Sequence, residues 1–141
     1  MIDALRMSLN ATAVFGFIMY IVVAAVLFAL FQFIYSRITP HREFALIREN
    51  NSAAALALGG SLIGFALPAS NIITYSIGIL DVIVWALIAA VVQLAAFGVA
   101  SVVLKGLSAR IAKGEMAAAI YSASVAVSVG LLNAACMTPT V

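Results

Sequence analysis

Residues 13–35 read AVFGFIMYIVVAAVLFALFQFIY and contain no Asp, Glu, Lys, Arg or His. Charge is also absent from residues 52–80, 82–104 and 116–141. At about 1.5 Å of rise per helical residue, each segment is long enough to cross a hydrocarbon layer roughly 30 Å thick. Because only a helix pairs its own backbone groups in lipid, the sequence predicts an all-α membrane protein with four transmembrane helices.

The composition excludes an ordinary soluble protein. Of the 141 residues, 66% are hydrophobic and 9% are charged, whereas a soluble domain carries about 25% charged residues. We expect residues 1–141 to form a single integral membrane domain, with loops too short to build an enzymatic module. The net charge of +2 fits basic residues that flank membrane spans. The lipid bilayer is therefore the expected partner, and nucleic acid is not.

Helix ends are predicted from local signals. Four helices are expected, over residues 13–35, 52–67, 82–104 and 116–135. Pro68 should end or kink the second helix because it lacks an N–H group. Asp81 should cap the third helix, and Gly106 should stop it. The first segment is expected to be a retained helix rather than a signal peptide. The apolar loop over residues 71–80 is expected to lie at the membrane interface or against the helix ends.

Basic residues predict the orientation. Two loops carry them, with Arg37, Arg42 and Arg48 in the first and Lys105, Arg110 and Lys113 in the other. The loop over residues 69–80 and the C-terminal tail have none, and Arg6 is the one dissenting charge. The positive-inside rule places the two basic loops in the cytoplasm. For a bacterial inner-membrane protein, both termini are then predicted to be periplasmic.

Few residues are suited to chemistry. Thr39 is a fair N-cap for a short helix from Pro40 to about Glu49, in which Glu43 would face water. His41 should be solvated, because one His without another His or a nearby Cys is a poor metal site. Cys136 should be a small buried hydrophobic residue. We therefore expect no catalytic residues, no metal and no cofactor.

Gln93 is the candidate intramembrane polar site, at the midpoint of the third helix. An amide there is costly unless it is paired. It can form an interhelical hydrogen bond or line a polar path, and both interpretations stay open. Ser61, Ser124 and Ser128 are the candidate partners at similar depth.

Small residues mark the candidate helix-packing positions. Gly60 and Gly64 form a GxxxG pair in the second helix, and Ala126 and Gly130 form a small stripe in the fourth. Such positions let two helices approach closely. They can serve packing within one protomer, a homo-oligomer seam, or both.

The chain divides into two similar halves, about residues 10–70 and 80–138. Each half has a long apolar helix, a basic loop and a second helix rich in small residues. Residues 51–56 (NSAAAL) align with residues 115–120 (EMAAAI). The sequence therefore predicts two tandem two-helix repeats, related by an axis along the membrane normal.

Several motifs resemble the domain-of-unknown-function 350 family of small bacterial inner-membrane proteins. The residues are 38–44 (ITPHREF), Leu46-Ile47, Asn50-Asn51, Ala53-Ala54, Gly60, Gly64 and 133–138 (NAACMT). The resemblance covers essentially the whole chain. It implies a repeated two-helix unit, and it supplies no catalytic residues to carry over.

Two functional hypotheses follow. The favoured one is a structural or accessory membrane component that associates with itself or with other inner-membrane proteins through its helices. The other is a small oligomeric channel or permease with a polar path near Gln93. A proton-coupled transporter is not expected, because the predicted spans contain no carboxylate, His or Lys.

Overall fold

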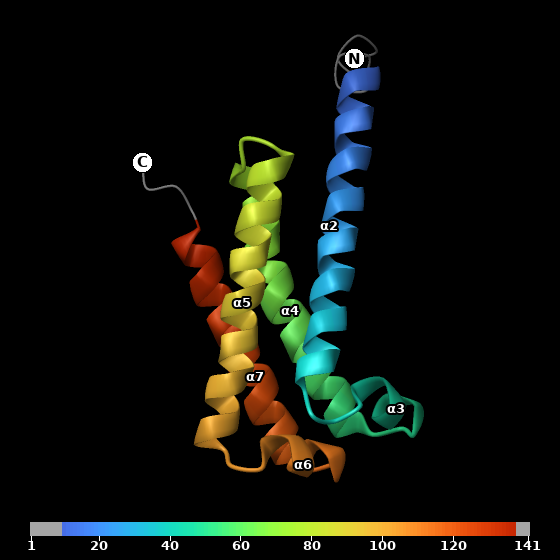
Figure 1. The fold of residues 1–141 in the computed structure, drawn as a ribbon, viewed down its shortest axis with the longest axis vertical. Helices are drawn as coiled ribbons and strands as arrows, with labels where there is room; N and C mark the ends of the chain where they lie inside the picture. Colours follow the sequence, from blue (N-terminus) through green and yellow to red (C-terminus); the bar gives the residue numbers. More distant parts are fainter. Residues whose placement is uncertain (1–9, 138–141) are drawn as a thin grey trace, which may run out of the picture.

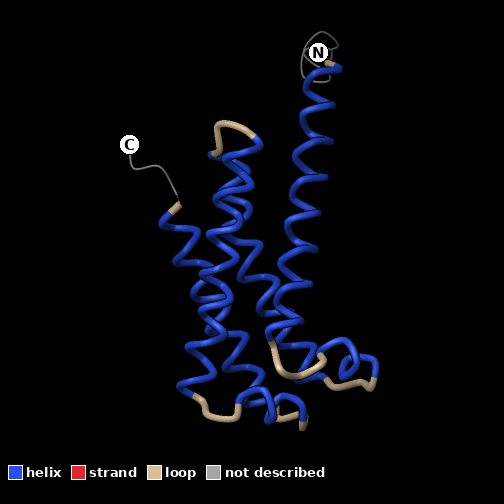
Figure 2. The backbone as a smooth tube through the Cα atoms, viewed as in Figure 1, coloured by secondary structure: helices blue, strands red, loops and turns tan. Residues whose placement is uncertain are grey.

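The computed structural model describes residues 10–137, and every regular element within that range is a helix (Figure 1, Figure 2). The helices in this range that are long and apolar enough to cross a membrane number four: α2 (Ala11–Ile38), α4 (Ser52–Tyr75), α5 (Ile79–Val103) and α7 (Met116–Cys136). Two short helices, α3 (Glu43–Arg48) and α6 (Leu107–Ala112), lie in the connections from α2 to α4 and from α5 to α7. The predicted all-α fold with four candidate spans is confirmed.

Helices α4, α5 and α7 form a bundle, and α2 stands beside it (Figure 1). The most extensive contact joins α4 to α7. The buried residues of α2 are Phe31 and Tyr35, both near its C-terminal end. The Phe31 ring stacks on Phe65 of α4, with centroids 4.3 Å apart. Aromatic packing therefore anchors α2 near its C-terminal end, while Tyr20 and Val23 of its N-terminal half pack, only partly buried, against the same core.

Helix α4 is longer than expected. We expected Pro68 to end or kink the helix. The helix does not end there, because it continues through Pro68 to Tyr75. Because proline has no N–H, the Gly64 carbonyl lacks its usual helical donor, and Gly130 of α7 packs against that carbonyl. The loop predicted over residues 71–80 is wrong in extent, since only residues 76–78 separate α4 from α5.

The predicted ends of the third span also shift. Gly78 is the N-cap of α5, and Asp81 lies within the first turn, where Oδ2 accepts a hydrogen bond from the Ile77 N–H at 3.2 Å. Asp81 thus pairs a free backbone donor without being the cap itself. Gly106 has a positive φ of 75° and precedes α6, a helix that the sequence did not predict.

Side-chain amides near the two ends of α4 hydrogen-bond to main-chain carbonyls in the second half of the chain. Nδ2 of Asn51 donates to the carbonyls of Ile111 and Ala112 at 3.3 and 3.0 Å, while Oδ1 caps α4 by accepting from the Ala54 N–H at 3.0 Å. Nδ2 of Asn71 donates to the Ala134 carbonyl at 2.7 Å. These bonds fix the position of α4 along the bundle axis.

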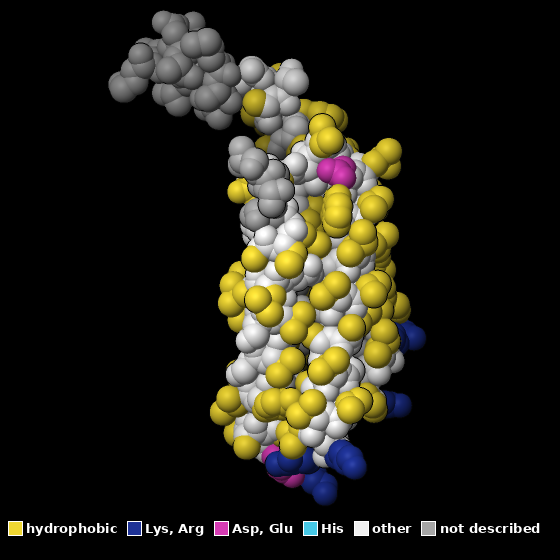
Figure 3. All heavy atoms as spheres, turned by 90° about the vertical axis from the view of Figure 1, so that its left-hand side faces the viewer, with side chains coloured by type: hydrophobic (Ala, Val, Ile, Leu, Met, Phe, Trp, Pro, Cys, Tyr) yellow, Lys and Arg dark blue, Asp and Glu magenta, His cyan; other side chains and the backbone are white. Residues whose placement is uncertain are grey.

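The outer surface of the helices is apolar, and Lys and Arg side chains gather toward one end (Figure 3). That end holds α3 and α6, while the first turn of α2 and the last turn of α7 lie at the other (Figure 1). Cys136 is exposed, so the prediction that it is buried is wrong. Ala134 occupies the buried face of α7, and two further residues turn the helix by about 200°, away from that face.

Candidate functional site

Gln93 is buried where α5 meets α4 and α7, with 1% of its surface exposed. Its Nε2 donates a hydrogen bond to the Ala126 carbonyl of α7 at 3.0 Å. Gly64 makes room for the amide, because a Cβ on Gly64 would overlap both Nε2 of Gln93 and the Ala126 carbonyl. The Oε1 atom of Gln93 is buried without a hydrogen-bond partner. The amide thus joins α5 to α7 and leaves one acceptor free.

The serines expected near Gln93 do not gather around it. Ser124 and Ser128 lie on the exposed outer face of α7, so the expectation that either pairs with Gln93 is wrong. Ser61 is buried, but its side chain hydrogen-bonds Tyr35 of α2. The buried serine of α7 is Ser122, which the sequence did not single out. The partner of Gln93 is a main-chain carbonyl, which no residue pattern reveals.

The four candidate packing residues meet at the contact between α4 and α7. A Cβ on Gly60 would lie 2.5 Å from Cα of Ala123, and a Cβ on Gly130 would lie 2.6 Å from Cα of Gly64. Ala126 is buried beside Gly64. The small stripes of the two helices therefore pack against each other within one protomer.

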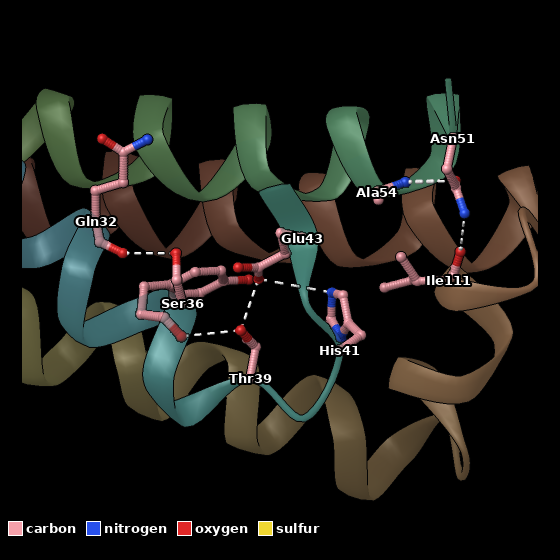
Figure 4. A network of polar contacts seen from close by, with 9 residues as sticks. Gln32, Ser36, Thr39, His41, Glu43, Asn51, Ala54 and Ile111 are labelled. Carbon is pink, nitrogen blue, oxygen red and sulfur yellow. Dashed lines mark hydrogen bonds and ion pairs between the residues drawn. The ribbon is translucent and has the colours of Figure 1, made fainter. Parts of the chain in front are cut away.

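A second polar site, which the sequence did not predict, lies where α2 ends and α3 begins (Figure 4). We call it the α2–α3 polar cluster, and it consists of Tyr35, Ser36, Thr39, His41 and Glu43. The Thr39 hydroxyl lies 2.9 Å from the Tyr35 carbonyl and donates to Oε1 of Glu43 at 2.7 Å. Nε2 of His41 lies 3.6 Å from the same Oε1.

Three expectations for this segment are wrong. Thr39 is the C-cap of α2, not the N-cap of α3. His41 is buried rather than solvated, and Glu43 is 1% exposed rather than facing water. Phe97 of α5 contributes to the burial of His41: its ring packs edge-on against Tyr35, and its centroid lies 6.4 Å from that of the His41 ring. Aromatic rings from α2 and α5 thus shield the end of the bundle from water.

Burial shifts His41 and Glu43 toward their neutral forms. Burial raises the pKa of the Glu43 carboxyl, and the hydrogen bond from Thr39 opposes that rise. Burial lowers the pKa of the His41 imidazole. Both ring nitrogens of His41 and Oε2 of Glu43 are buried without a hydrogen-bond partner. A buried ionisable pair of this kind can hold or release a proton at the edge of the bundle.

The part of the chain between residues 10 and 137 contains no group of three His, Cys, Asp or Glu side chains arranged to hold a metal ion. His41 and Glu43 together supply two ligand side chains, fewer than a tetrahedral metal site uses. No local signal separates the motif over residues 38–44 from an ordinary solvated loop, since its Thr, His and Glu stand among arginines.

Comparison with known proteins places the chain among membrane proteins without an assigned activity. A family model described as Domain of Unknown Function (DUF350) matches residues 8–137. The chain is 38% identical over 123 residues to the UPF0719 inner membrane protein YjfL of Escherichia coli (strain K12). The aligned residues make up 87% of this chain and 93% of that protein. The YjfL protein of Escherichia coli O157:H7 matches equally well. No solved structure matches the chain.

Proposed function

The chain belongs to the Domain of Unknown Function (DUF350) family, and on that basis we propose that it is a non-catalytic, multi-pass component of the bacterial inner membrane that acts through helix association. Its Escherichia coli relative is named as an inner membrane protein, which supports this location. The four apolar helices support a multi-pass arrangement. The surface through which it associates is proposed to lie outside the contact between α4 and α7, because Gly60, Gly64 and Gly130 are occupied within the protomer.

One observation carries this proposal: a hollow of about 540 Å³ between α4 and α7 on their outer face. We call it the α4–α7 outer groove, and its exposed or open positions are Leu56, Gly59, Ile63, Ser124 and Ser128. A Cβ on Gly59 would meet no atom within 4 Å. Lipid tails are as apolar as leucine, so helices in a membrane associate through small residues and hydroxyl groups. This groove offers both to a second copy of the chain.

Gly59→Leu is expected to reduce self-association without unfolding the protomer, because a Cβ at Gly59 meets no atom within 4 Å and the side chain occupies the groove. Oligomer size would be measured by native electrophoresis and by mass photometry in detergent. Gly16→Leu on α2 is the matched control, since a Cβ there also meets no atom within 4 Å. Equal oligomer size for both variants and the wild type would contradict the proposed surface.

A small oligomeric channel or permease is the second candidate, and Gln93 is the observation that favours it. Its buried Oε1 is an acceptor without a partner, as a group that contacts a permeating species would be. The channel candidate is disfavoured because Ser124 and Ser128 face outward and do not extend a polar path from Gln93. Helix association therefore remains the preferred function.

Gln93→Leu separates the two candidates. If the amide only joins helices, we expect a stability change of about 1 kcal/mol or less and no ion or solute flux in liposomes for either protein. The measurements are thermal stability in detergent and flux after reconstitution. Flux in the wild type that disappears in a stable variant would overturn the preferred function in favour of the channel.

The two tandem repeats, about residues 10–70 and 80–138, are proposed on the basis of matching helix ends 64 positions apart. Asn50 and Gly114 have positive φ angles of 64° and 83°. The N–H groups that follow bond back in the same way, from Asn51 to the Leu46 carbonyl at 2.9 Å and from Glu115 to the Arg110 carbonyl at 3.0 Å. Both are Schellman caps, and both lead directly into a long helix.

We also propose that the end carrying α3 and α6 faces the cytoplasm and that both termini are periplasmic, because the basic loops lie at that end. Alkaline phosphatase fused after Val141 should then be active, and fusions within residues 42–49 should be inactive. The opposite activity pattern would reject this orientation.

A further inference from the structure

Two arginines line one cavity at the C-terminal end of α2. This cavity, which we call the arginine cavity, has a volume of about 530 Å³, and its walls include Phe33, Ser36, Arg37, Thr39, Arg42 and Glu43. The Arg37 guanidinium lies 4.6 Å from the centre of the Phe33 ring, a cation–π distance that orients it. The cavity therefore presents two cationic groups at the end of a membrane-spanning helix.

No carboxylate between residues 10 and 137 forms an ion pair with either of these arginines, Arg37 and Arg42. Arg110, at the same end of the bundle, pairs with Glu115 at 2.6 Å. Glu43 also lines the cavity, but its carboxyl is buried and bonded to Thr39. Burial raises the pKa of that carboxyl and favours its neutral form. The cavity thus has an excess of positive charge that suits an anionic ligand.

A separate apolar groove lies one helical turn farther along α2. The α2–α4 groove has a volume of about 450 Å³ and is lined by Ala25, Ala29 and Gln32 of α2, together with apolar residues of α4 and α5. Ser36 of the arginine cavity is one turn from Gln32, and its hydroxyl donates to the Gln32 carbonyl at 2.8 Å (Figure 4). From Ser36 to Ala25 the helix rises about 16 Å, close to half of a hydrocarbon layer roughly 30 Å thick.

We propose that the arginine cavity and the α2–α4 groove together bind one anionic phospholipid. The phosphate lies against Arg37 and Arg42, whose guanidinium groups suit phosphate oxygens. One acyl chain follows the face of Ala25 and Ala29 between α2 and α4. A bound lipid of this kind would fill the α2–α4 groove.

The headgroup is tested with the purified full chain by native mass spectrometry, with phosphatidylglycerol and zwitterionic phosphatidylcholine as probes. We expect the wild type to retain phosphatidylglycerol preferentially, and the double variant Arg37→Gln/Arg42→Gln to lose about tenfold or more in affinity. Arg48→Gln is the matched control, because Arg48 is exposed in the same segment but does not line the cavity. Equal losses in the double variant and the control would overturn the proposal.

The acyl chain is tested by filling the groove. Ala29→Phe should weaken phosphatidylglycerol binding, whereas Val26→Phe should not, because Val26 is exposed outside the groove. Millimolar glycerol phosphate should not displace the bound lipid. If Ala29→Phe binds like the wild type, or if glycerol phosphate competes, the site recognises a free anion and the lipid assignment is wrong. Melting curves for every variant restrict the comparison to folded protein.

Discussion

Gly64→Leu should prevent the α4–α5–α7 bundle from folding, at a cost of about 3 kcal/mol or more. A side chain at this position would overlap Nε2 of Gln93 and the Ala126 carbonyl. The Gln93 amide can move away only by breaking its hydrogen bond to the Ala126 carbonyl. The carbonyl itself is part of the α7 main chain and cannot move without the helix. Gly130→Leu should have the same effect, because its Cβ would overlap the Gly64 carbonyl and Cα.

Thermal melting and the monodisperse yield in detergent measure this effect. Gly98→Leu on α5 is the matched control, since a Cβ at Gly98 meets no atom within 4 Å. Leu56→Ala should also be mild, because Leu56 is 38% exposed. Gly64→Leu protein that melts with the control would show that α4 and α7 do not pack at these positions.

Glu43→Gln should become progressively more stable than the wild type as the pH rises. The folded protein holds the Glu43 proton more tightly than the unfolded chain does, because burial raises the pKa of this carboxyl. Wild-type stability from this group is therefore lost as the pH rises above about 4.5, the unfolded value, toward the higher folded value. Within that window the loss is about 1.4 kcal/mol for each pH unit. Glutamine keeps an acceptor for Thr39 and carries no charge.

His41 contributes with the opposite sign. Burial lowers the pKa of its imidazole, so the wild type loses stability as the pH falls below about 6.5, and Glu43→Gln does not remove this loss. The measurement is the difference in melting temperature between variant and wild type from pH 4 to pH 9. Glu49→Gln is the control, because Glu49 is exposed at the C-cap of α3. A difference that is constant with pH, or that falls as the pH rises, would rule out a buried Glu43.

The spans could be predicted from the sequence because charge is excluded from lipid, and the gaps between charged residues are long. The rotation of each helix about its own axis could not be predicted from the sequence. In a membrane both the lipid-facing and the protein-facing sides are apolar, so periodicity does not separate them. Gly60 and Gly64 marked the contact of α4 because only small residues allow that approach. Ser124 and Ser128 were misplaced because nothing in α7 distinguishes the face that they share.

The α2–α3 polar cluster was missed for a different reason. His41 and Glu43 follow an apolar helix in a segment with arginines, which is the ordinary composition of a solvated loop. The His41 ring lies beside Phe97, more than fifty positions away in the chain, so only the tertiary fold reveals this burial. Pro68 was misjudged similarly. A proline usually ends a helix in water, but here α7 covers the carbonyl that it leaves free.

The attachment of α2 near one end has a mechanical consequence. Residues 13–35 span about 35 Å as a helix, more than the thickness of an average hydrocarbon layer. A helix that is too long for its bilayer tilts, and tilting costs least where no neighbour resists it. The fully buried residues of α2 lie near its C-terminal end, so the rest of the helix can change its tilt at a lower cost, with Phe31 and Tyr35 as the pivot. A thinner or thicker bilayer would therefore change the angle of α2 before it disturbs the bundle.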